Sequence, residues 1–449
     1  MKNKSIYILI VIAAIVVLQG CSSFLDIKSD KSLAVPSTLE DYQSIMNEVD
    51  NFLVASEGEA MSCDHHIPDL TFEALSCQTI KDMYCWMDNP QIESCTSSGW
   101  NLAYKNIFRA NVVVNGVGDF EAVNGKSSSS SNIKGQGFFI RAINYFELSQ
   151  IWTDTYSGIE SRNKLGLPLK YSSDFNESTT RSSLGETFDQ ILRDLHMAEE
   201  LLPARQQSIY LPGKVAAWAY LARVYLYMQD YESASLFAKK CIDGGYQLLD
   251  YRTVNGSPTF PFKLSDNKEV LYARFINNAS TPSSLYTSAV DKELYEMYDH
   301  KDYRKSLFFM YMSNRYIFRG DYSGGLSGTF CGPTLAEMYL VRAETLLRLG
   351  DYEEAKVYLE EFMSNRTYLV STYNKENSFQ AILNERRKEL VYRGIRFGDV
   401  RRLNVTGAGI SLKRIIREQE YLLLPNDPRA TLLIPQLVIE KSAIVQNPR

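Results

Sequence analysis

The sequence predicts a mainly α-helical protein in which tetratricopeptide-like helical pairs form a scaffold that carries long irregular insertions. Two observations predict this architecture. Segments with helical periodicity recur in pairs, and small residues stand where the two helices of a pair must pack closely. Between the best pairs lie long stretches rich in Tyr, Ser, Asn and Gly, and such long loops are uncommon unless they carry function or are disordered.

The clearest pair runs from Lys214 to Met228 and, after a short turn, on to about Ile242. Its first helix has the W-x-x-L-A-x-x-Y spacing of a tetratricopeptide helix, formed by Trp218, Leu221, Ala222 and Tyr225. Ala234 stands where the second helix of such a repeat needs a small residue. These residues predict two antiparallel helices in close contact.

The same pattern returns in a second pair, with helices expected over 335–349 and 353–362. A shift of 121 residues aligns Ala222 with Ala343, Asp230-Tyr231 with Asp351-Tyr352, and Ala234 with Ala355. Three coincidences at one offset indicate an internal repeat.

Two weaker pairs are expected nearer the N-terminus. Residues 100–117 form one helix, which we pair with 38–49, and residues 137–152 pair with 184–201. Ser182 or Ser183 provides an N-cap for the last of these helices, because Glu186 follows Ser183 at the spacing of a capping box.

Three stretches are predicted to be irregular. Residues 52–98 hold a cluster of cysteines, residues 120–134 contain five consecutive serines and are expected to be a flexible loop, and residues 250–332 separate the two best repeats. Binding residues often lie on loops that a rigid scaffold positions, so the insertions are the expected place for a binding site.

The N-terminal sequence predicts an export signal with a lipid attachment site. Lys2 and Lys4 precede an apolar run over 6–18, which is too short for a membrane span of ~20 residues but fits the apolar part of a signal peptide. Leu18-Gln19-Gly20-Cys21 resembles a bacterial lipobox. We therefore expect residues 1–20 to be a lipoprotein signal peptide and Cys21 to carry lipid. An ordinary signal peptide with a chance cysteine, or a short N-terminal anchor, is the alternative.

Four further cysteines lie close together, and their spacing matches no zinc motif. The favoured interpretation is that disulfides cross-link an exported loop. A metal site beside the adjacent histidines, or free buried thiols, are the alternatives. Which cysteines would pair cannot be read from the sequence. The cluster consists of Cys63, Cys77, Cys85 and Cys95.

Composition and motifs exclude several classes of function. The formal net charge of −5 and the lack of a basic block argue against nucleic acid as a partner. The sequence holds no zinc-protease, nucleophile-elbow, P-loop or dinucleotide motif, so no catalytic residue, metal or cofactor is predicted. The charged run over 385–402 is interpreted as a structural ion-pair network, because oppositely charged residues recur there at helical spacing.

Taken in order, the motifs resemble the SusD/RagB family of nutrient-binding outer-membrane lipoproteins. The C-terminal half matches best, through Glu385-Arg386-Arg387, Glu389-Leu390, Gly394, Arg396-Phe397, Asp399 and Arg401-Arg402, although Arg393 and Gly398 depart from the residues usual in the family. Other matching elements are Phe24-Leu25-Asp26, Trp100, Tyr104, Ile107, Ala110-Asn111, Arg141-Ala142, Tyr145-Phe146, Leu148, Gly166-Leu167-Pro168-Leu169, Arg181, Ile191, Asp194-Leu195, Ala198, Leu201-Leu202-Pro203, Asp302, Arg304, Ile434-Pro435-Gln436 and Gln446-Asn447-Pro448.

The resemblance implies a single SusD-like domain over 21–449, with an N-terminal part over about 21–200 and a RagB/SusD part over about 201–449. It implies a non-enzymatic lipoprotein on the exterior of the outer membrane. Such a protein binds a glycan or another nutrient and partners a SusC-type TonB-dependent transporter for import. Two alternatives stay open: a scaffold lipoprotein that binds only a protein partner through its helical repeats, and a surface glycosidase.

For ligand binding, the resemblance points to aromatic and polar side chains on the insertions, because sugar C–H faces stack on flat rings while hydroxyl groups need hydrogen-bond partners. Trp86 is favoured because the other tryptophans have helix-packing roles; burial of Trp86 in a small cluster with Met83 and Met87 is the alternative. The other candidates are Tyr84, Asp64, His65 and His66 in the first insertion and Tyr311, Tyr316, Arg319 and Tyr322 in the second.

Overall fold

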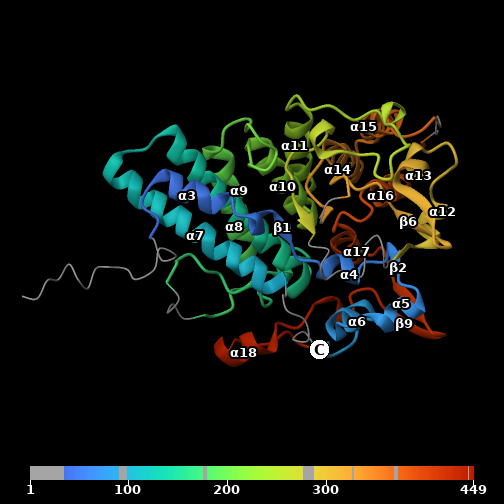
Figure 1. Ribbon diagram of the computed structural model, residues 1–449, viewed down its shortest axis with the longest axis horizontal. Helices are drawn as coiled ribbons and strands as arrows, with labels where there is room; N and C mark the ends of the chain where they lie inside the picture. Colours follow the sequence, from blue (N-terminus) through green and yellow to red (C-terminus); the bar gives the residue numbers. More distant parts are fainter. Residues whose placement is uncertain are drawn as a thin grey trace, which may run out of the picture.

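The computed structural model describes residues 35–90, 99–174, 179–276, 288–325, 328–368, 373–442 and 444–449. Long helices dominate the described chain. Figure 1 shows α3 (Leu39–Met46), α7 (Gly99–Asn124), α8 (Ser128–Trp152) and α9 (Leu184–Leu201) together on one side of the molecule. The prediction of a mainly α-helical, tetratricopeptide-like scaffold is confirmed. The predicted signal peptide and Cys21 lie outside the described residues.

Both predicted repeats are present. The first consists of α10 (Lys214–Tyr227) and α11 (Tyr231–Ile242), and the second of α14 (Leu335–Arg348) and α15 (Tyr352–Ser364). The turn residues Gln229 and Gly350 both have positive φ, 66° and 91°, and each is followed by an aspartate whose side chain caps the next helix. The small residues at the helix contacts are fully buried or nearly so: Ala222, Ala234, Ala343 and Ala355. Close packing of the two helices therefore explains the sequence repeat.

The serine run is not a flexible loop, so that prediction is wrong. Helix α7 continues to Asn124, and α8 begins at Ser128 after only a short turn. Ser127 caps α8: its side chain accepts from the Ser130 backbone N–H at 3.0 Å, and the Ser130 hydroxyl accepts from the Ser127 N–H at 2.9 Å. Serine is unfavourable inside helices, because its hydroxyl group hydrogen-bonds to nearby backbone groups, but it is among the best N-cap residues. The serine run therefore starts a helix and does not interrupt one.

A buried ion pair joins the helices of the N-terminal half. Arg141 on α8 makes two hydrogen bonds of 2.7 Å to Asp194 on α9, and its third guanidinium nitrogen donates to Asn111 on α7 at 2.9 Å. The predicted pairing of α8 with α9 is confirmed, as is the capping box of Ser183 and Glu186 at the start of α9.

The second insertion is more ordered than the sequence predicts. It contributes β3 (Phe275–Ile276), β4 (Ala289–Val290), β5 (Phe309–Met312), β6 (Arg315–Phe318) and β7 (Thr329–Phe330), together with α12 (Lys292–Glu296) and α13 (Tyr303–Phe308). A separate aromatic core holds this region together, formed mainly by Tyr251, Phe262, Tyr298, Phe308, Phe309, Phe318, Tyr322 and Phe330. Strand β3 lies between β1 (Leu53–Val54), which is parallel to it, and the antiparallel β7.

The charged C-terminal motif forms the buried ion-pair network that the sequence predicts. It lies on α16 (Ser378–Glu389) and α17 (Arg396–Val405). Glu389 meets Arg366 at 2.9 Å and Arg304 at 3.2 Å, while Arg402 meets both Asp399 and Glu344 at 2.6 Å. The network joins α13, α14, α16 and α17 with Arg366, which follows α15, so these residues hold the fold together.

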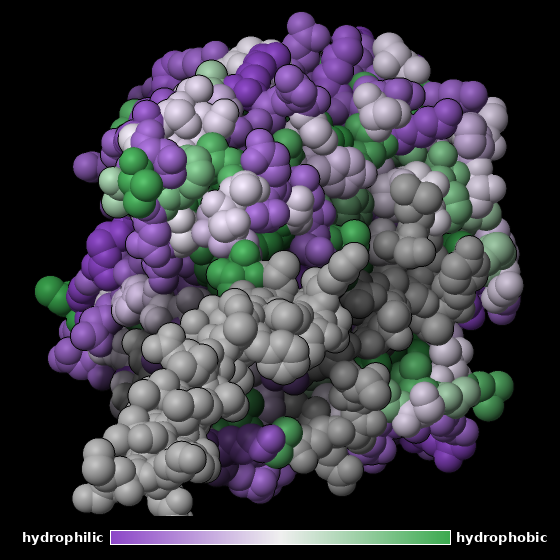
Figure 2. Space-filling model, turned by 60° about the vertical axis from the view of Figure 1, so that its left-hand side comes forward, coloured by the Kyte–Doolittle hydropathy of each residue, from purple (hydrophilic) through white to green (hydrophobic). Residues whose placement is uncertain are grey.

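Further elements lie in the lower part of Figure 1: α5 (Asp69–Ala74), α6 (Gln78–Tyr84), α18 (Gln436–Ser442) and the antiparallel hairpin of β8 (Leu412–Ile416) and β9 (Gln419–Leu423). Among the described residues, no helix is both long enough and apolar enough to cross a bilayer. The coloured residues of the face in Figure 2 are mainly hydrophilic over its upper part, with smaller hydrophobic areas between them.

Candidate binding surface

The first insertion buries Trp86 and does not present it. The side chain is 1% exposed, and its indole N–H donates to the Met61 carbonyl at 3.1 Å, at the end of α4 (Glu57–Met61). Arg414 on β8 lies over the ring, with its guanidinium carbon 4.4 Å from the ring centre. The prediction that Trp86 stacks on a ligand is therefore wrong, and the alternative, burial in a cluster that includes Met83, describes the structure.

Three neighbours of Trp86 are buried as well. Tyr84 accepts a hydrogen bond from the Ile67 N–H at 2.9 Å and is covered by Arg414, whose guanidinium carbon lies 3.5 Å from the ring centre. Asp64 pairs with Arg387 at 3.0 Å. His65 is 3% exposed, neither ring nitrogen has a hydrogen-bond partner among the described residues, and burial holds its pKa well below the usual value. These side chains mainly support the fold.

The fourth neighbour, His66, is exposed on β2 (His65–His66) and lines a pocket of about 520 Å³. The residues that line the pocket also include the buried His65 and Tyr84, and Asp291 and Glu293 at the start of α12. The structure thus brings together three of the sequence candidates, of which His66 alone has an exposed side chain.

The predicted disulfide staple is present only in part. Cys77 is disulfide-bonded, whereas Cys63 and Cys85 are free thiols, and Cys95 lies outside the described residues. Burial raises the pKa of Cys85 to about 11, so this thiol stays protonated. Among the described residues, no three or more His, Cys, Asp and Glu side chains are arranged to hold a metal ion.

The second insertion brings together three tyrosines, here called the tyrosine platform: Tyr311 and Tyr316, which are exposed, and Tyr295, which is half-buried. The rings of Tyr295 and Tyr316 stack with centroids 3.9 Å apart and an interplanar angle of 19°. Tyr311 meets Tyr316 edge-on at 5.2 Å. Tyr311 is 61% exposed and Tyr316 is 38% exposed, so an aromatic surface faces solvent.

The local sequence builds this platform. Strands β5 and β6 are joined by Ser313 and Asn314, both with positive φ (51° and 61°), as a tight hairpin turn requires. The resulting register pairs Tyr311 with Tyr316 and places both rings on one face, while Ile317 points into the core. The Tyr311 hydroxyl donates to Asn314 Oδ1 at 2.7 Å, which fixes the orientation of the outermost ring.

A cation lies at the back of the platform. The Lys305 ammonium is 4.8 Å from the centre of the Tyr295 ring and donates to the Tyr298 carbonyl at 2.7 Å. Sequence reasoning missed Tyr295 because a single tyrosine in a five-residue helix carries no pattern, and only tertiary contact brings it to Tyr316.

The last two candidates of the second insertion are structural. Tyr322 is 1% exposed, its hydroxyl is 2.6 Å from that of Tyr251, and the Arg393 guanidinium carbon lies 3.7 Å from its ring centre. The prediction that Tyr322 contacts ligand is therefore wrong. Arg319 donates to the carbonyls of Gly256, Pro258 and Ser306, so it ties a neighbouring loop to the hairpin.

Comparison with known protein families matches two regions of the chain. A family model described as "Starch-binding associating with outer membrane" matches residues 23–226, and a model described as "SusD family" matches residues 332–422. SusD-like protein P2 of Formosa agariphila is 29% identical over 139 residues, which cover 31% of this chain and 25% of that protein. SusD-like protein P38 of the same organism is 28% identical over 136 residues, 30% of this chain and 24% of that protein. The matched stretch thus spans about a quarter of each relative.

Solved structures share the fold over nearly the whole chain. A SusD superfamily protein from Bacteroides thetaiotaomicron superposes with a TM-score of 0.75 at 23% identity, covering 92% of this chain and 100% of that one. A laminarin-binding SusD-like protein superposes with a TM-score of 0.65 at 20% identity, covering 91% and 97%. Two family models placed in order, together with the helical scaffold, lead to one conclusion: the chain belongs to the SusD/RagB family.

Proposed function

We propose that this chain is a cell-surface glycan-binding lipoprotein, and that the tyrosine platform is its glycan-binding surface. Lipid on Cys21 holds it to the outer membrane, with the helical scaffold facing the cell exterior. There it partners a SusC-type TonB-dependent transporter and passes glycan to it for import, without catalysing a reaction. The observation that carries the proposal is the exposed pair of Tyr311 and Tyr316, with the Tyr316 ring held in a stack on the half-buried Tyr295.

The platform has the physical properties that a saccharide requires. Sugar rings present apolar C–H faces that pack on aromatic rings, and rings already fixed in place lose little conformational entropy on binding. The Tyr295–Tyr316 stack and the Tyr311–Asn314 hydrogen bond fix the rings before ligand arrives. Polar groups at its edge, including the Asn314 amide and the tyrosine hydroxyls, can meet sugar hydroxyl groups.

A panel of neutral polysaccharides that includes laminarin and starch tests the ligand class, by affinity electrophoresis and calorimetry. For a polysaccharide that binds, Tyr311→Ala and Tyr316→Ala are each expected to weaken binding about 3- to 10-fold, the loss of one aromatic contact. Tyr171→Ala is the matched control: Tyr171 is 43% exposed and, unlike the platform residues, lies over Arg141 on α8. If all three variants weaken polysaccharide binding equally, or if none of them weakens it, the platform is excluded as the binding site.

The anchor and the partner are tested separately. Cys21→Ala is expected to release the protein from the outer-membrane fraction, and persistence in that fraction would refute lipid attachment. Co-purification of a TonB-dependent transporter with the wild-type protein, from membranes solubilised in mild detergent, is expected. If only a protein partner and no glycan is bound, the scaffold alternative holds instead.

A further inference from the structure

A second pocket, here called the C-terminal pocket, lies away from the tyrosine platform and has a volume of about 550 Å³. It is bounded by the segment that follows α8, by α17 and by the β8–β9 hairpin with the chain that follows it. Ligand pockets in proteins typically enclose ~300–1,000 Å³, so the volume suits a small ligand.

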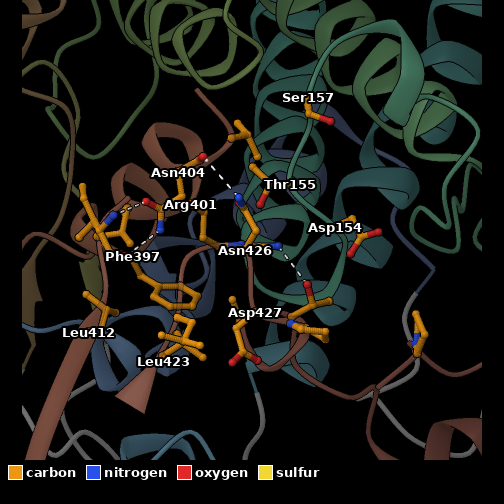
Figure 3. Close-up of a pocket in the computed structure, with 18 of the residues that line it drawn as sticks. Asp154, Thr155, Ser157, Phe397, Arg401, Asn404, Leu412, Leu423, Asn426 and Asp427 are labelled. Carbon is orange, nitrogen blue, oxygen red and sulfur yellow. Dashed lines mark hydrogen bonds between the residues drawn. The ribbon is translucent and has the colours of Figure 1, made fainter. Parts of the chain in front are cut away.

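The pocket is amphipathic. Figure 3 shows Phe397, Leu412 and Leu423 along one side and Asp154, Thr155 and Ser157 along the opposite side, with Asn426 and Asp427 between them. The three apolar residues are buried, whereas Ser157 and Asn426 are exposed and Thr155 is half-buried. Accessible apolar contact therefore comes from other lining residues, Val405 and Ile410, which are half-buried, and Leu424, which is exposed. Thr155, Ser157 and Asn426 offer hydroxyl and amide groups that can donate and accept hydrogen bonds.

Two arginines of the pocket lack a carboxylate partner. Arg401 is 5% exposed and donates to the Gln150 carbonyl, to the Thr153 carbonyl at 2.6 Å and to Thr431 Oγ1 at 3.1 Å. Arg449 donates to the carbonyls of Asp88 at 2.8 Å, Pro428 at 3.1 Å and Thr431 at 2.7 Å. Among the described residues, neither guanidinium forms an ion pair, and both converge on Thr431.

The carboxylates of the pocket are already compensated by other cations. Asp154 pairs with Lys164 at 3.1 Å, and Asp427 pairs with Arg429 at 2.6 Å. A buried cation is stabilised when an anion lies close to it. Arg401 is buried without such an anion among the described residues, whereas Arg449 is exposed at the rim and is already attracted by Asp88 and Asp427. An anionic group from a ligand would supply the missing charge.

We propose that the C-terminal pocket binds a carboxylated saccharide unit, of the uronic-acid class, as a second site distinct from the tyrosine platform. The sugar ring packs on the accessible apolar residues Val405, Ile410 and Leu424. Its hydroxyl groups bind Thr155, Ser157 and Asn426, and its carboxylate faces Arg449 at the rim, with Arg401 behind it. The inference extends the proposed glycan-binding function to a charged sugar, but it does not depend on the platform.

Calorimetric titration of the full-length protein with D-glucuronate tests the pocket, with D-glucose and lactate as probes that lack either the carboxylate or the ring. Glucuronate is expected to bind with the highest affinity of the three. Arg449→Met is expected to weaken glucuronate binding about tenfold, the worth of a charge-assisted hydrogen bond, and Ser157→Trp to abolish it by filling the pocket. Arg252→Met, which removes an exposed arginine elsewhere, is the matched control and is expected to change nothing.

The outcomes separate this proposal from the preceding one. If glucuronate binding persists in Tyr316→Ala and is lost in Ser157→Trp, the C-terminal pocket is the site. If the wild-type protein does not bind glucuronate, or binds lactate equally well, the saccharide proposal for this pocket is refuted, while polysaccharide binding by the platform would stand. Near-identical far-UV circular dichroism of all the variants is required, which excludes unfolding as the cause.

Discussion

Replacing Arg366 with methionine should destabilise the protein strongly, and more strongly at alkaline than at acidic pH. The Arg366 side chain is fully buried, donates to Glu269 at 2.6 Å and to Glu389 at 2.9 Å, and lies over the Tyr251 ring at 3.9 Å. Methionine keeps the length of the side chain but leaves its carboxylate partners without this cation. Glu389 retains Arg304 at 3.2 Å, whereas the partners that remain to Glu269 among the described residues are neutral donors, the Leu249 N–H and the Tyr322 hydroxyl.

The expected loss is about 3–5 kcal/mol at pH 8, the usual cost of removing one member of a buried ion pair. Burial already raises the pKa of Glu269 and Arg366 opposes that rise, so the variant raises this pKa further. The folded variant then holds a proton that the unfolded chain releases, and stability falls as pH rises, by up to about 1.4 kcal/mol per pH unit while Glu269 titrates. The loss should therefore be smaller at pH 5 than at pH 8.

Urea unfolding, followed by far-UV circular dichroism, measures the loss of unfolding free energy at pH 5 and at pH 8. The dependence of this free energy on urea concentration should be the same for the variant and the wild-type protein. Arg252→Met is the control, because Arg252 pairs with Asp250 at 2.6 Å but is 56% exposed; its loss of stability should be much smaller than that of Arg366→Met. Adding Glu269→Gln to Arg366→Met should recover part of the loss. A loss below about 1 kcal/mol at pH 8, or an equal loss at both pH values, would refute this account of the network.

Three further outcomes are expected, each measurable by urea unfolding. Trp86→Ala should cost about 3–5 kcal/mol through the cavity it leaves, and weaker polysaccharide binding by a variant of undiminished stability would contradict its structural role. Ser127→Ala should cost about 1 kcal/mol through loss of the α8 cap, whereas the exposed Ser129→Ala should cost almost nothing; equal effects would argue against the cap. Burial raises the pKa of Glu59 from 4.5 to about 7, with a smaller contribution from the negative charge of nearby Asp64, so stability falls as pH rises between these values. Glu59→Gln should reduce that fall by about 3 kcal/mol, and an unchanged pH profile would contradict the shift.

The helical scaffold could be predicted from sequence because its determinants are local. Ala222 and Ala234 lie within a few turns of each other, and the same spacing recurs at Ala343 and Ala355, so periodicity and residue size suffice. The serine run misled the prediction for an equally local reason: composition indicated a loop, whereas the Ser127–Ser130 capping box depends on which serine comes first.

The binding surface was predictable only in part. Tyr311 and Tyr316 lie on one hairpin, and both are exposed, as expected of ligand-binding aromatics. Trp86 and Tyr84 are buried partly because Arg414 covers their rings. Arg414 lies 330 residues after Tyr84, so no local sequence pattern predicts this contact. Burial set by distant residues is what single-sequence reasoning misses here.

The position of Arg414 in the chain has a consequence for the order of folding. Its guanidinium donates to the carbonyls of Ala60, Ser62 and Tyr84 and covers the rings of Tyr84 and Trp86. These hydrogen bonds join residues 330 to 354 positions apart in the chain, and contacts of such large sequence separation form late in folding. Until β8 is in place, the rings of Tyr84 and Trp86 lack their contact with Arg414. The first insertion therefore reaches its native packing only after the C-terminal hairpin has folded against it.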